Sequence, residues 1–441
     1  MSSIKKGRLG RALSLSRLGA RMALGQGRRM LSSDPLQVHR QLALTLAAEL
    51  GELKGLPMKI GQLLSYMEGV VPDEYRAAYQ EVLAELRTHS EPMAWEVAAK
   101  VFEQELGAPP AQLLDSIDQS PIASASIGQV YRATHDGEPV CVKIQYPDIG
   151  EATLSDLQNL DGVIALMRTL MPNVDTRQVI DDFRARLQEE CDYLQEADYQ
   201  TRFARIYHDD PELLVPEVLQ PLCSRRVLTT RRIDGTDFDT FARNASQAQR
   251  DRAGAALFRF AFGSLLQHGL FHADPHPGNL LLDCGPRGKL CMLDYGCVQP
   301  IDEPARRDIA VLLRTAMDGG QLLQPALRAM GVTQLDEASA AATVPILDKA
   351  LEPLVAAQPY RFTRDYALDI TRAVIDAKLK LGARYLTRRG RFVVERQGVM
   401  FVVRNLFGLA SILGTLRAEG DFRGMAQRML DEPGLRDAAP A

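Results

Sequence analysis

The stretch His-Ala-Asp-Pro-His-Pro-Gly-Asn at residues 272–279, followed by Leu-Asp-Tyr-Gly at residues 293–296, decides how this chain is interpreted. Asp274 and Asn279 lie five positions apart, and Asp294 follows fifteen positions later at the end of a hydrophobic run. A site that handles phosphate needs oxygen ligands for Mg²⁺ and a carboxylate beside the attacking nucleophile. These side chains can supply both, so the two segments predict a phosphate site.

The spacing of these three residues is the one that protein kinases use. By that spacing Asp274 is the catalytic-loop aspartate, while Asn279 and Asp294 are the Mg²⁺ ligands. His272 stands where kinases place the histidine of His-Arg-Asp, and we expect it to orient the loop. Tyr295 replaces the phenylalanine of Asp-Phe-Gly, a conservative change that should leave the metal role of Asp294 intact.

A zinc site is the rival interpretation of the same segment. His268, His272 and His276 recur every four residues, as zinc-binding histidines on one helix face do. Pro275 and Pro277 interrupt any such helix, however, and no glutamate lies between the histidines to act as a general base. The phosphate site is therefore favoured.

Composition and charge describe an ordinary folded protein of 441 residues, long enough for two or three domains or one bilobal domain with extensions. Hydrophobic residues make up 46% and charged residues 24%, and the net charge of −4 predicts no attraction to nucleic acid. The six cysteines contain no Cys-x-x-Cys pair, and we expect reduced, mostly buried thiols. The apolar stretch 405–416 is too short for a transmembrane anchor.

The first 33 residues carry lysines and arginines and no acidic residue. This basic segment has three interpretations: a mitochondrial presequence, a contact with anionic lipid headgroups, or a disordered arm. Arginine outnumbers lysine and alanine is abundant, which favours a bacterial genome. We therefore expect a cytoplasmic protein, peripheral to the inner membrane, with a mitochondrial location as the alternative.

Upstream lies a candidate nucleotide-binding hairpin. Residues 123–130 keep the spacing of the kinase phosphate loop Gly-x-Gly-x-x-Gly-x-Val, but alanines replace its first two glycines and should stiffen it. Lys143 ends Val-Cys-Val-Lys and matches the kinase strand whose lysine contacts the α- and β-phosphates. The predicted nucleotide-binding residues are Ala123, Ser124, Ala125, Ser126, Gly128, Val130 and Lys143.

Lys143 requires an acidic partner on the helix that follows. Glu190 and Asp192 cannot share a helix face, whereas Asp192 and Glu196 can, because they are four residues apart. The pattern alone leaves the choice of partner open.

Periodicity and turn residues outline the remaining elements. Interrupted helices are expected over 36–69 and 73–107, and strand character is expected only from Pro121 onward. Asp136-Gly137 predicts a hairpin turn, and Asp234-Gly235 predicts a hinge. Further strands are expected at 130–133, 140–144, 213–219, 226–230, 280–283 and 290–294, and helices at 176–207, 247–268 and throughout the region past Ile301.

With these motifs in place, the chain resembles the UbiB/AarF (ADCK) family of atypical protein-kinase-like proteins, from about Leu53 to beyond Val298. Lys-Gly-Leu-Pro-Met-Lys-Ile-Gly-Gln at 54–62 is similar to the family's Lys-x-Gly-Gln signature. The alanine-rich loop at 123–126 looks like the family's replacement for the glycine-rich loop, and Glu-Cys-Asp at 190–192 is similar to its Glu-x-Asp motif.

The resemblance implies an α+β, bilobal protein-kinase-like fold with an N-terminal helical extension and a helical C-terminal region. It implies that Lys59 and Gln62 enter the active site, that Glu190 and Asp192 hold the extension, and that Glu196 is left as the partner of Lys143. The expected domains are a basic, flexible segment at 1–35, the helical extension at 36–110, the N-lobe at 111–233, and the C-lobe with its helical extension at 234–441.

The resemblance also implies a Mg²⁺-dependent ATPase, or a small-molecule or lipid kinase, that binds ATP or ADP and supports ubiquinone or membrane lipid metabolism. After Gly296 the chain proceeds almost directly to Pro304, without Ala-Pro-Glu or a long activation loop, so a protein kinase is disfavoured. The form of the catalytic loop differs from that of the ubiquinone branch and leaves the pathway open. A non-catalytic, nucleotide-gated scaffold is the alternative function.

The expected partners follow from these functions. They are the nucleotide, membrane lipid at the protein's surface, and quinone-pathway or lipid-pathway proteins; nucleic acid is not among them, and a homodimer is a further alternative.

Overall fold

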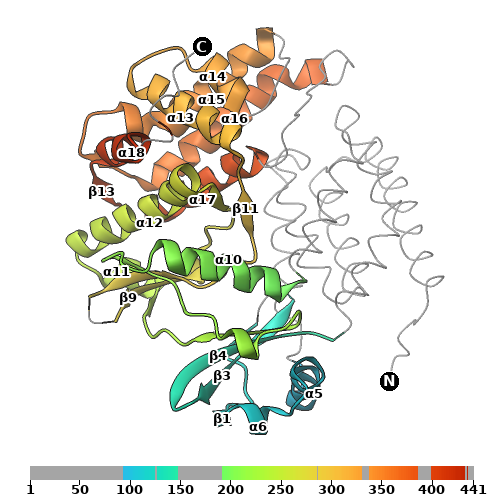
Figure 1. Ribbon diagram of the computed structural model, residues 1–441. Coiled ribbons are helices and arrows are strands. Elements are labelled where there is room, and N and C mark those ends of the chain that lie inside the picture. Colours follow the sequence, from blue (N-terminus) through green and yellow to red (C-terminus); the bar gives the residue numbers. More distant parts are fainter. Residues whose placement is uncertain are drawn as a thin grey trace, which may run out of the picture. The chain divides into compact units, whose positions relative to one another are not determined.

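The computed structural model describes residues 93–124, 127–147, 191–285, 287–329, 337–385, 399–432 and 435 (Figure 1). It divides into two compact units, the first containing residues up to Gln195 together with Leu219–Arg231, and the second containing Glu196–Val218 and the residues from Arg232 onward. The division at Arg231 lies beside the predicted hinge. The predicted helices over 36–69, residues 176–190 of the helix predicted over 176–207, and the site residues Lys59, Gln62, Ala125, Ser126 and Glu190 lie outside the described residues.

The first unit is built on an antiparallel sheet of five described strands, in the order β1-β3-β4-β6 with β2 paired to β3. The predicted hairpin is its centre, and its turn residues Asp136 and Gly137 both have positive φ, 51° and 75°, the turn geometry that suits the twist of paired strands. The strands are β1 (Ser116–Ile117), β2 (Ala123–Ser124), β3 (Gly128–His135), β4 (Glu138–Gln145) and β6 (Val227–Arg231).

Helix α5 covers this sheet with its apolar face. Ala98, Val101 and Phe102 are buried against the β3–β4 core, and Trp95 meets Tyr131 edge-to-face at 5.3 Å between ring centroids. Strand character begins at β1, before Pro121, because that short segment pairs with the end of β3. The helical elements of this unit are α5 (Trp95–Leu106), α6 (Pro110–Leu113) and η1 (Gln220–Leu222).

The described part of the second unit contains three small sheets and a long central helix, α12 (Gln247–His268). A capping box between Ser246 and Gln249 begins α12, and Gly269 at φ 63° ends it, so the predicted bounds are confirmed. The first sheet contains β5 (Leu213–Leu214), β10 (Lys289–Met292), β9 (Leu280–Cys284) and β7 (Thr236–Asp237). The second contains β8 (Leu270–His272) and β11 (Val298–Pro300), and the third contains β12 (Tyr360–Arg361) and β13 (Glu419–Gly420).

Two predicted strands are shorter than expected. The strand predicted at 213–219 stops at Leu214, since Pro216 has no N–H for a ladder and its carbonyl instead accepts a hydrogen bond from the Gln200 side chain. The strand predicted at 290–294 ends at Met292, although the Leu293 amide still donates to the Asn279 carbonyl at 2.9 Å, in register with the β9–β10 pairing.

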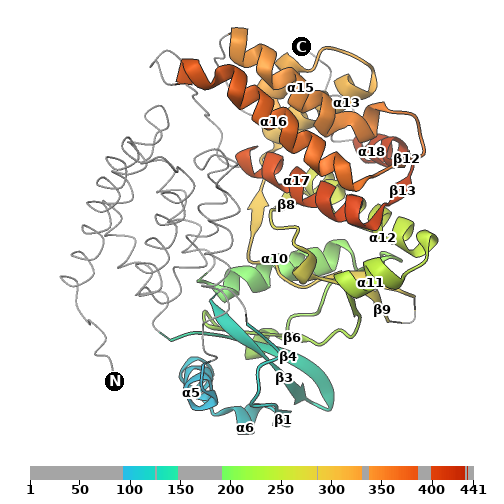
Figure 2. The same cartoon turned by 180° about the vertical axis from the view of Figure 1, so that it is seen from behind.

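A helical layer packs on the far side of α12 from β9 and β10 (Figures 1 and 2). The prediction that everything past Ile301 is helical needs one correction: Tyr360–Arg361 (β12) pairs with Glu419–Gly420 (β13). Within the described residues no helix is long and apolar enough to cross a membrane. The helices are α10 (Tyr193–Ile206), α11 (Phe238–Asn244), α13 (Glu303–Met317), α14 (Leu323–Ala329), α15 (Glu337–Val355), α16 (Arg364–Tyr385), α17 (Val399–Leu416) and α18 (Phe422–Leu430).

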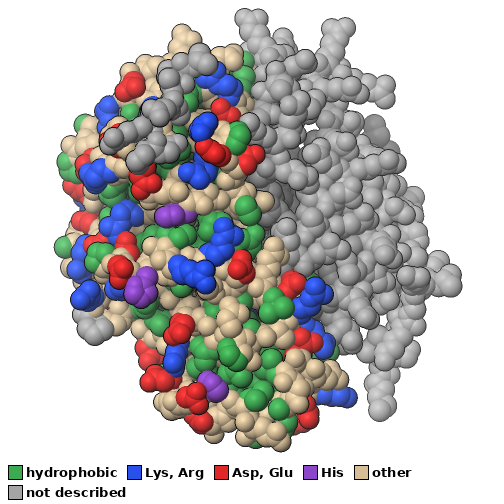
Figure 3. All heavy atoms as spheres, in the orientation of Figure 1, with side chains coloured by type: hydrophobic (Ala, Val, Ile, Leu, Met, Phe, Trp, Pro, Cys, Tyr) green, Lys and Arg blue, Asp and Glu red, His purple; other side chains and the backbone are tan. Residues whose placement is uncertain are grey.

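Acidic and basic side chains are interspersed over the described face shown in Figure 3.

Candidate functional site

The predicted catalytic loop connects β8 to β9 in the second unit. After His272 the chain makes a tight loop in which the His276 amide donates to the Asp274 carbonyl and the Asn279 amide donates to the His276 carbonyl, both at 2.9 Å. Residues 277–279 form a 3₁₀ turn. This turn brings Asn279 Nδ2 to 3.4 Å from Asp274 Oδ2, so the predicted catalytic aspartate and the predicted metal ligand are in contact.

The Asp294 segment joins this loop through backbone hydrogen bonds. The Leu293 amide donates to the Asn279 carbonyl at 2.9 Å, which places the two predicted Mg²⁺ ligands at the same end of the β9–β10 hairpin. The Gly296 amide donates to Asp294 Oδ1 at 2.9 Å and holds that carboxylate in place.

The His272 side chain connects the catalytic loop to the Asp294 segment. Its Nε2 lies 2.6 Å from the Asp294 carbonyl oxygen, and because a carbonyl only accepts, Nε2 carries the proton. The imidazole is 3% exposed and is surrounded by the rings of Phe203, Phe260 and Tyr295, with centroids at 6.4, 5.6 and 5.7 Å. This geometry fits the orienting role predicted for His272.

Tyr295 is completely buried in the same aromatic group, 5.1 Å from Phe203 between centroids. Burial raises the pKa of its phenol well above the usual value, with smaller contributions from Cys291, Tyr207 and Asp294. Among the described residues its hydroxyl has no hydrogen-bond partner. The aromatic side chain of the Asp-Tyr-Gly segment therefore acts here as an apolar anchor.

Glu196 is buried on α10, 4% exposed. A methyl group at Gly296 would lie 3.2 Å from Asp294 Oδ1 and 3.5 Å from Glu196 Oε2, so the two carboxylates flank the same glycine. A buried carboxylate needs compensating positive charge. Pairing of Glu196 with Lys143, which belongs to the first unit, stays a prediction.

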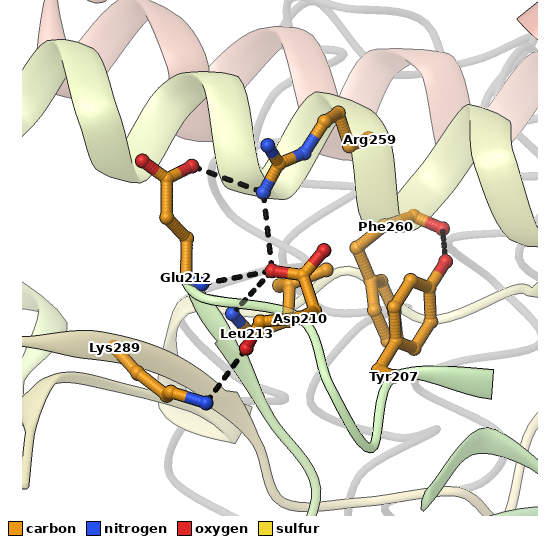
Figure 4. Close-up of polar contacts among 7 residues, drawn as sticks. All are labelled: Tyr207, Asp210, Glu212, Leu213, Arg259, Phe260 and Lys289. Carbon is orange, nitrogen blue, oxygen red and sulfur yellow. Dashed lines mark hydrogen bonds and ion pairs between the residues drawn. The ribbon is translucent and has the colours of Figure 1, made fainter. Parts of the chain in front are cut away.

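An ion-pair and hydrogen-bond network connects the segment between α10 and β5 to α12 and to β10 (Figure 4). Asp210 Oδ1 accepts hydrogen bonds from the Glu212 and Leu213 amides and from Arg259, while Arg259 also pairs with Glu212 at 3.0 Å. Lys289 Nζ donates to the Asp210 carbonyl at 2.7 Å. The network was not predicted from sequence. Its members on α12 and β10 are Arg259, next to Phe260, and Lys289.

The first unit carries the predicted nucleotide-binding hairpin. Ala123 and Ser124 form β2 and are exposed, and Ala123 pairs with Val130 on β3. Val130 in turn lies opposite Lys143 on β4. These four predicted nucleotide-binding residues therefore occupy neighbouring positions of one sheet.

Gly128, at the start of β3, has a packing reason for being glycine. A methyl group there would collide with the Ile144 carbonyl oxygen and lie 2.9 Å from the Tyr193 hydroxyl oxygen. The sequence motif suggested close approach to phosphate, whereas the described neighbours of this Cβ position are the protein's own atoms.

Sequence reasoning missed one residue in the first unit, Tyr193. Tyr193 is 1% exposed, and the Lys143 ammonium lies 4.8 Å from its ring centroid. Asp192 accepts a hydrogen bond from the Leu194 amide at 3.0 Å and pairs with Arg225 at 3.5 Å, so it caps the first turn of α10. Sequence reasoning assigned Asp192 to holding the helical extension and placed it inside a helix over 176–207, whereas α10 begins only at Tyr193, directly after this cap.

The donor set of the second unit fits a magnesium ion. Asn279 and Asp294 offer hard oxygen atoms, and Mg²⁺ commonly completes its shell with water and phosphate oxygens. Across the described ranges, no group of three or more His, Cys, Asp and Glu side chains is arranged to hold a metal ion.

Comparisons with known proteins agree with these motifs. Residues 85–321 match the family model for the ABC1 atypical kinase-like domain. The Arabidopsis thaliana chloroplastic protein Activity of BC1 complex kinase 3 is 36% identical over 56% of this chain and 35% of its own length. The rat mitochondrial atypical kinase COQ8B is 31% identical over 60% of this chain and 50% of its own length. The chain thus covers between a third and a half of these relatives.

Among solved structures, the Mycobacterium tuberculosis protein Rv3197, in complex with erythromycin, is similar to this chain. The TM-score is 0.61 and the sequence identity 30%, over 89% of this chain and 95% of that one.

Proposed function

Because the chain belongs to the ABC1 atypical kinase-like family, as its resemblance to UbiB/AarF (ADCK) proteins predicted, we propose that it binds ATP or ADP with Mg²⁺ and transfers phosphate to water or a small acceptor. The observation that carries the proposal is the grouping of Asp274, Asn279 and Asp294 at one end of the β9–β10 hairpin. The kinase-like α+β fold is confirmed by the family match.

Each residue has a chemical task in this proposal. Asn279 and Asp294 hold Mg²⁺, which neutralises phosphate charge when it is bound. Asp274 accepts the proton of the attacking hydroxyl group, and its contact with Asn279 Nδ2 keeps its carboxylate oriented. Lys143 binds the α- and β-phosphates, with Glu196 as its ion-pair partner.

A small acceptor is favoured by the short path after Gly296. β11 begins at Val298 and pairs at once with β8, and α13 begins at Glu303 with Asp302 as its cap. In conventional kinases a longer segment at this point carries the peptide-docking platform. We propose water or a small hydroxyl compound as the acceptor, in ubiquinone or membrane lipid metabolism, with the protein peripheral to a membrane.

The proposal is tested by thermal stabilisation with Mg²⁺ and ATP or ADP, together with phosphate release. We expect a rise in the unfolding temperature for the wild-type protein that is lost in Asp294→Asn. Asp283→Asn is the matched control: this exposed residue lies in the same hairpin at φ 57°, which asparagine tolerates. No stabilisation of the wild-type protein, or equal stabilisation of Asp294→Asn, contradicts nucleotide binding at this site.

A non-catalytic, nucleotide-gated scaffold is the second candidate, and the exposed Ala123-Ser124 edge of the alanine-substituted loop favours it. Asp274→Asn separates the two. If this variant binds nucleotide normally and still complements a deletion strain, the scaffold is correct; if complementation is lost while binding remains, the phosphate-transfer proposal is supported.

A further inference from the structure

The side chain of Lys143 lies over an aromatic ring that the kinase motif does not include. Its ammonium is 4.8 Å from the centroid of the Tyr193 ring, within the range of cation–π contacts. Tyr193 is 1% exposed, so its ring is shielded from water. Cation–π contacts are strongest when they are shielded in this way.

Tyr193 is fixed from several directions within the first unit. Its backbone amide donates to the Arg225 carbonyl at 3.1 Å, and the neighbouring Asp192 pairs with the Arg225 side chain at 3.5 Å. Its hydroxyl oxygen lies 2.9 Å from the position that a Cβ on Gly128 would occupy. The ring is thereby held between the first turn of α10, the start of β3 and Lys143 on β4.

An aromatic ring holds an ammonium group in a different way than a carboxylate does. The ring attracts the cation through its quadrupole, without a formal negative charge and without accepting all three N–H groups. The ring thus fixes the position of the ammonium through its charge and does not set the direction of its N–H groups. Tyr193 and Glu196 are three residues apart on α10 and so lie on the same helix face.

We propose that Tyr193 is a positioning residue for Lys143: its ring holds the ammonium where the phosphates of the nucleotide bind, and its hydroxyl packs against the glycine at the start of β3. This inference rests on the proposed function, because it assumes that Lys143 binds nucleotide phosphate.

The test compares two substitutions in the full-length protein. Tyr193→Phe keeps the ring, and we expect its Kd for Mg²⁺·ADP to remain within about twofold of the wild-type value. Tyr193→Leu removes the ring, and we expect Kd to rise by about 5- to 30-fold, the change that corresponds to a desolvated cation–π contact. Equal Kd values for wild type and Tyr193→Leu would overturn the inference.

A double-mutant cycle distinguishes positioning from a general structural effect. In a Lys143→Met background we expect Tyr193→Leu to weaken ADP binding by less than about twofold, because the ammonium that the Tyr193 ring would hold is already absent. Equal weakening in both backgrounds would mean that Tyr193 acts on the fold and not through Lys143. If Tyr193→Leu does not fold, Tyr193→Met fills the space without an aromatic face and is judged by the same criteria.

The same contact can be observed without nucleotide. Lysine side chains are labelled by reductive dimethylation with an isotope and observed by NMR. The Lys143 signal is the one that disappears in Lys143→Arg. An aromatic ring facing the Lys143 ammonium shifts this signal upfield. We expect that shift in wild type and in Tyr193→Phe but not in Tyr193→Leu; its absence from wild type would refute the contact. If the wild-type protein does not bind ADP, the proposed function is contradicted. The NMR result then still tests whether Tyr193 contacts Lys143.

Discussion

Two regions of the second unit are packed very differently. Around His272, three aromatic rings and the short hydrogen bond from the imidazole to the Asp294 carbonyl fill the space next to the catalytic loop. In the helical layer beyond α12, by contrast, apolar side chains from α12 to α17 leave a cavity of about 110 Å³. The same hydrophobic cluster includes both regions. Close packing is therefore concentrated where carboxylates and amides must be held in place.

The largest expected effect is that of removing the imidazole. His272→Ala loses the contact with the Asp294 carbonyl and leaves a void among rings, so we expect a loss of about 3 kcal/mol in the free energy of unfolding and loss of nucleotide binding. Chemical denaturation measures this loss, with the exposed His208→Ala as the control. A loss below about 1 kcal/mol would mean that the region is less closely packed than the distances indicate.

The second expected effect concerns Gly296. In Gly296→Ala the new methyl group lies 3.2 Å from Asp294 Oδ1 and crowds that carboxylate, so we expect Mg²⁺·ADP affinity to fall about tenfold. In the helical layer, Gly420→Ala meets its nearest neighbour at an ordinary 3.6 Å and should bind ADP like wild type. Isothermal titration calorimetry with Mg²⁺·ADP measures the affinity of both variants. Equal affinities would contradict the close contact between the new methyl group at Gly296 and its neighbours.

Filling the cavity is expected to have a smaller effect of the opposite sign. Ala410 lines the cavity on α17, and Ala410→Leu should stabilise the protein by about 1 kcal/mol. The same enlargement in the close-packed region, Ala273→Leu, should destabilise it by about 1–3 kcal/mol. Thermal unfolding of both variants tests the comparison directly, and a destabilising Ala410→Leu would show that the cavity does not accommodate the added carbons.

The smallest expected effect on stability is that of removing the Tyr295 hydroxyl group. Tyr295→Phe removes a buried hydroxyl that has no partner among the described residues, so we expect a gain of less than about 1 kcal/mol in stability and unchanged ADP affinity. Denaturation midpoints measure the gain. A clear loss of stability would reveal a polar contact for this hydroxyl.

Local signals explain which elements the sequence predicted. The bounds of α12 follow from Ser246 and Gly269, and the first hairpin follows from Asp136-Gly137, because caps and turns act over a few residues. The short β12–β13 pair was missed because its partners are separated by about sixty residues and carry no strand pattern.

The candidate site divides in the same way. Motif spacing pointed to Asp274 and Asn279 together, and their side chains are in contact because both lie in one tight loop. The contact of Lys143 with Tyr193 was not foreseen, because nothing in the residues between them indicates which ring will cover a lysine. The roles assigned to the site residues, Lys59, Gln62 and Glu190 among them, stay predictions.

The β9–β10 hairpin has a consequence for how such motifs are defined. Asn279 and Leu293 meet at its open end, whereas the turn between Cys284 and Lys289 closes the opposite end. Strand register therefore sets how near the two metal ligands lie, and residues inserted at the turn would leave that proximity unchanged. A search pattern that demands a fixed count between the asparagine and the aspartate would discard homologues whose turn is longer. A pattern that anchors each residue to its own strand end, with a variable gap between them, would retain those homologues.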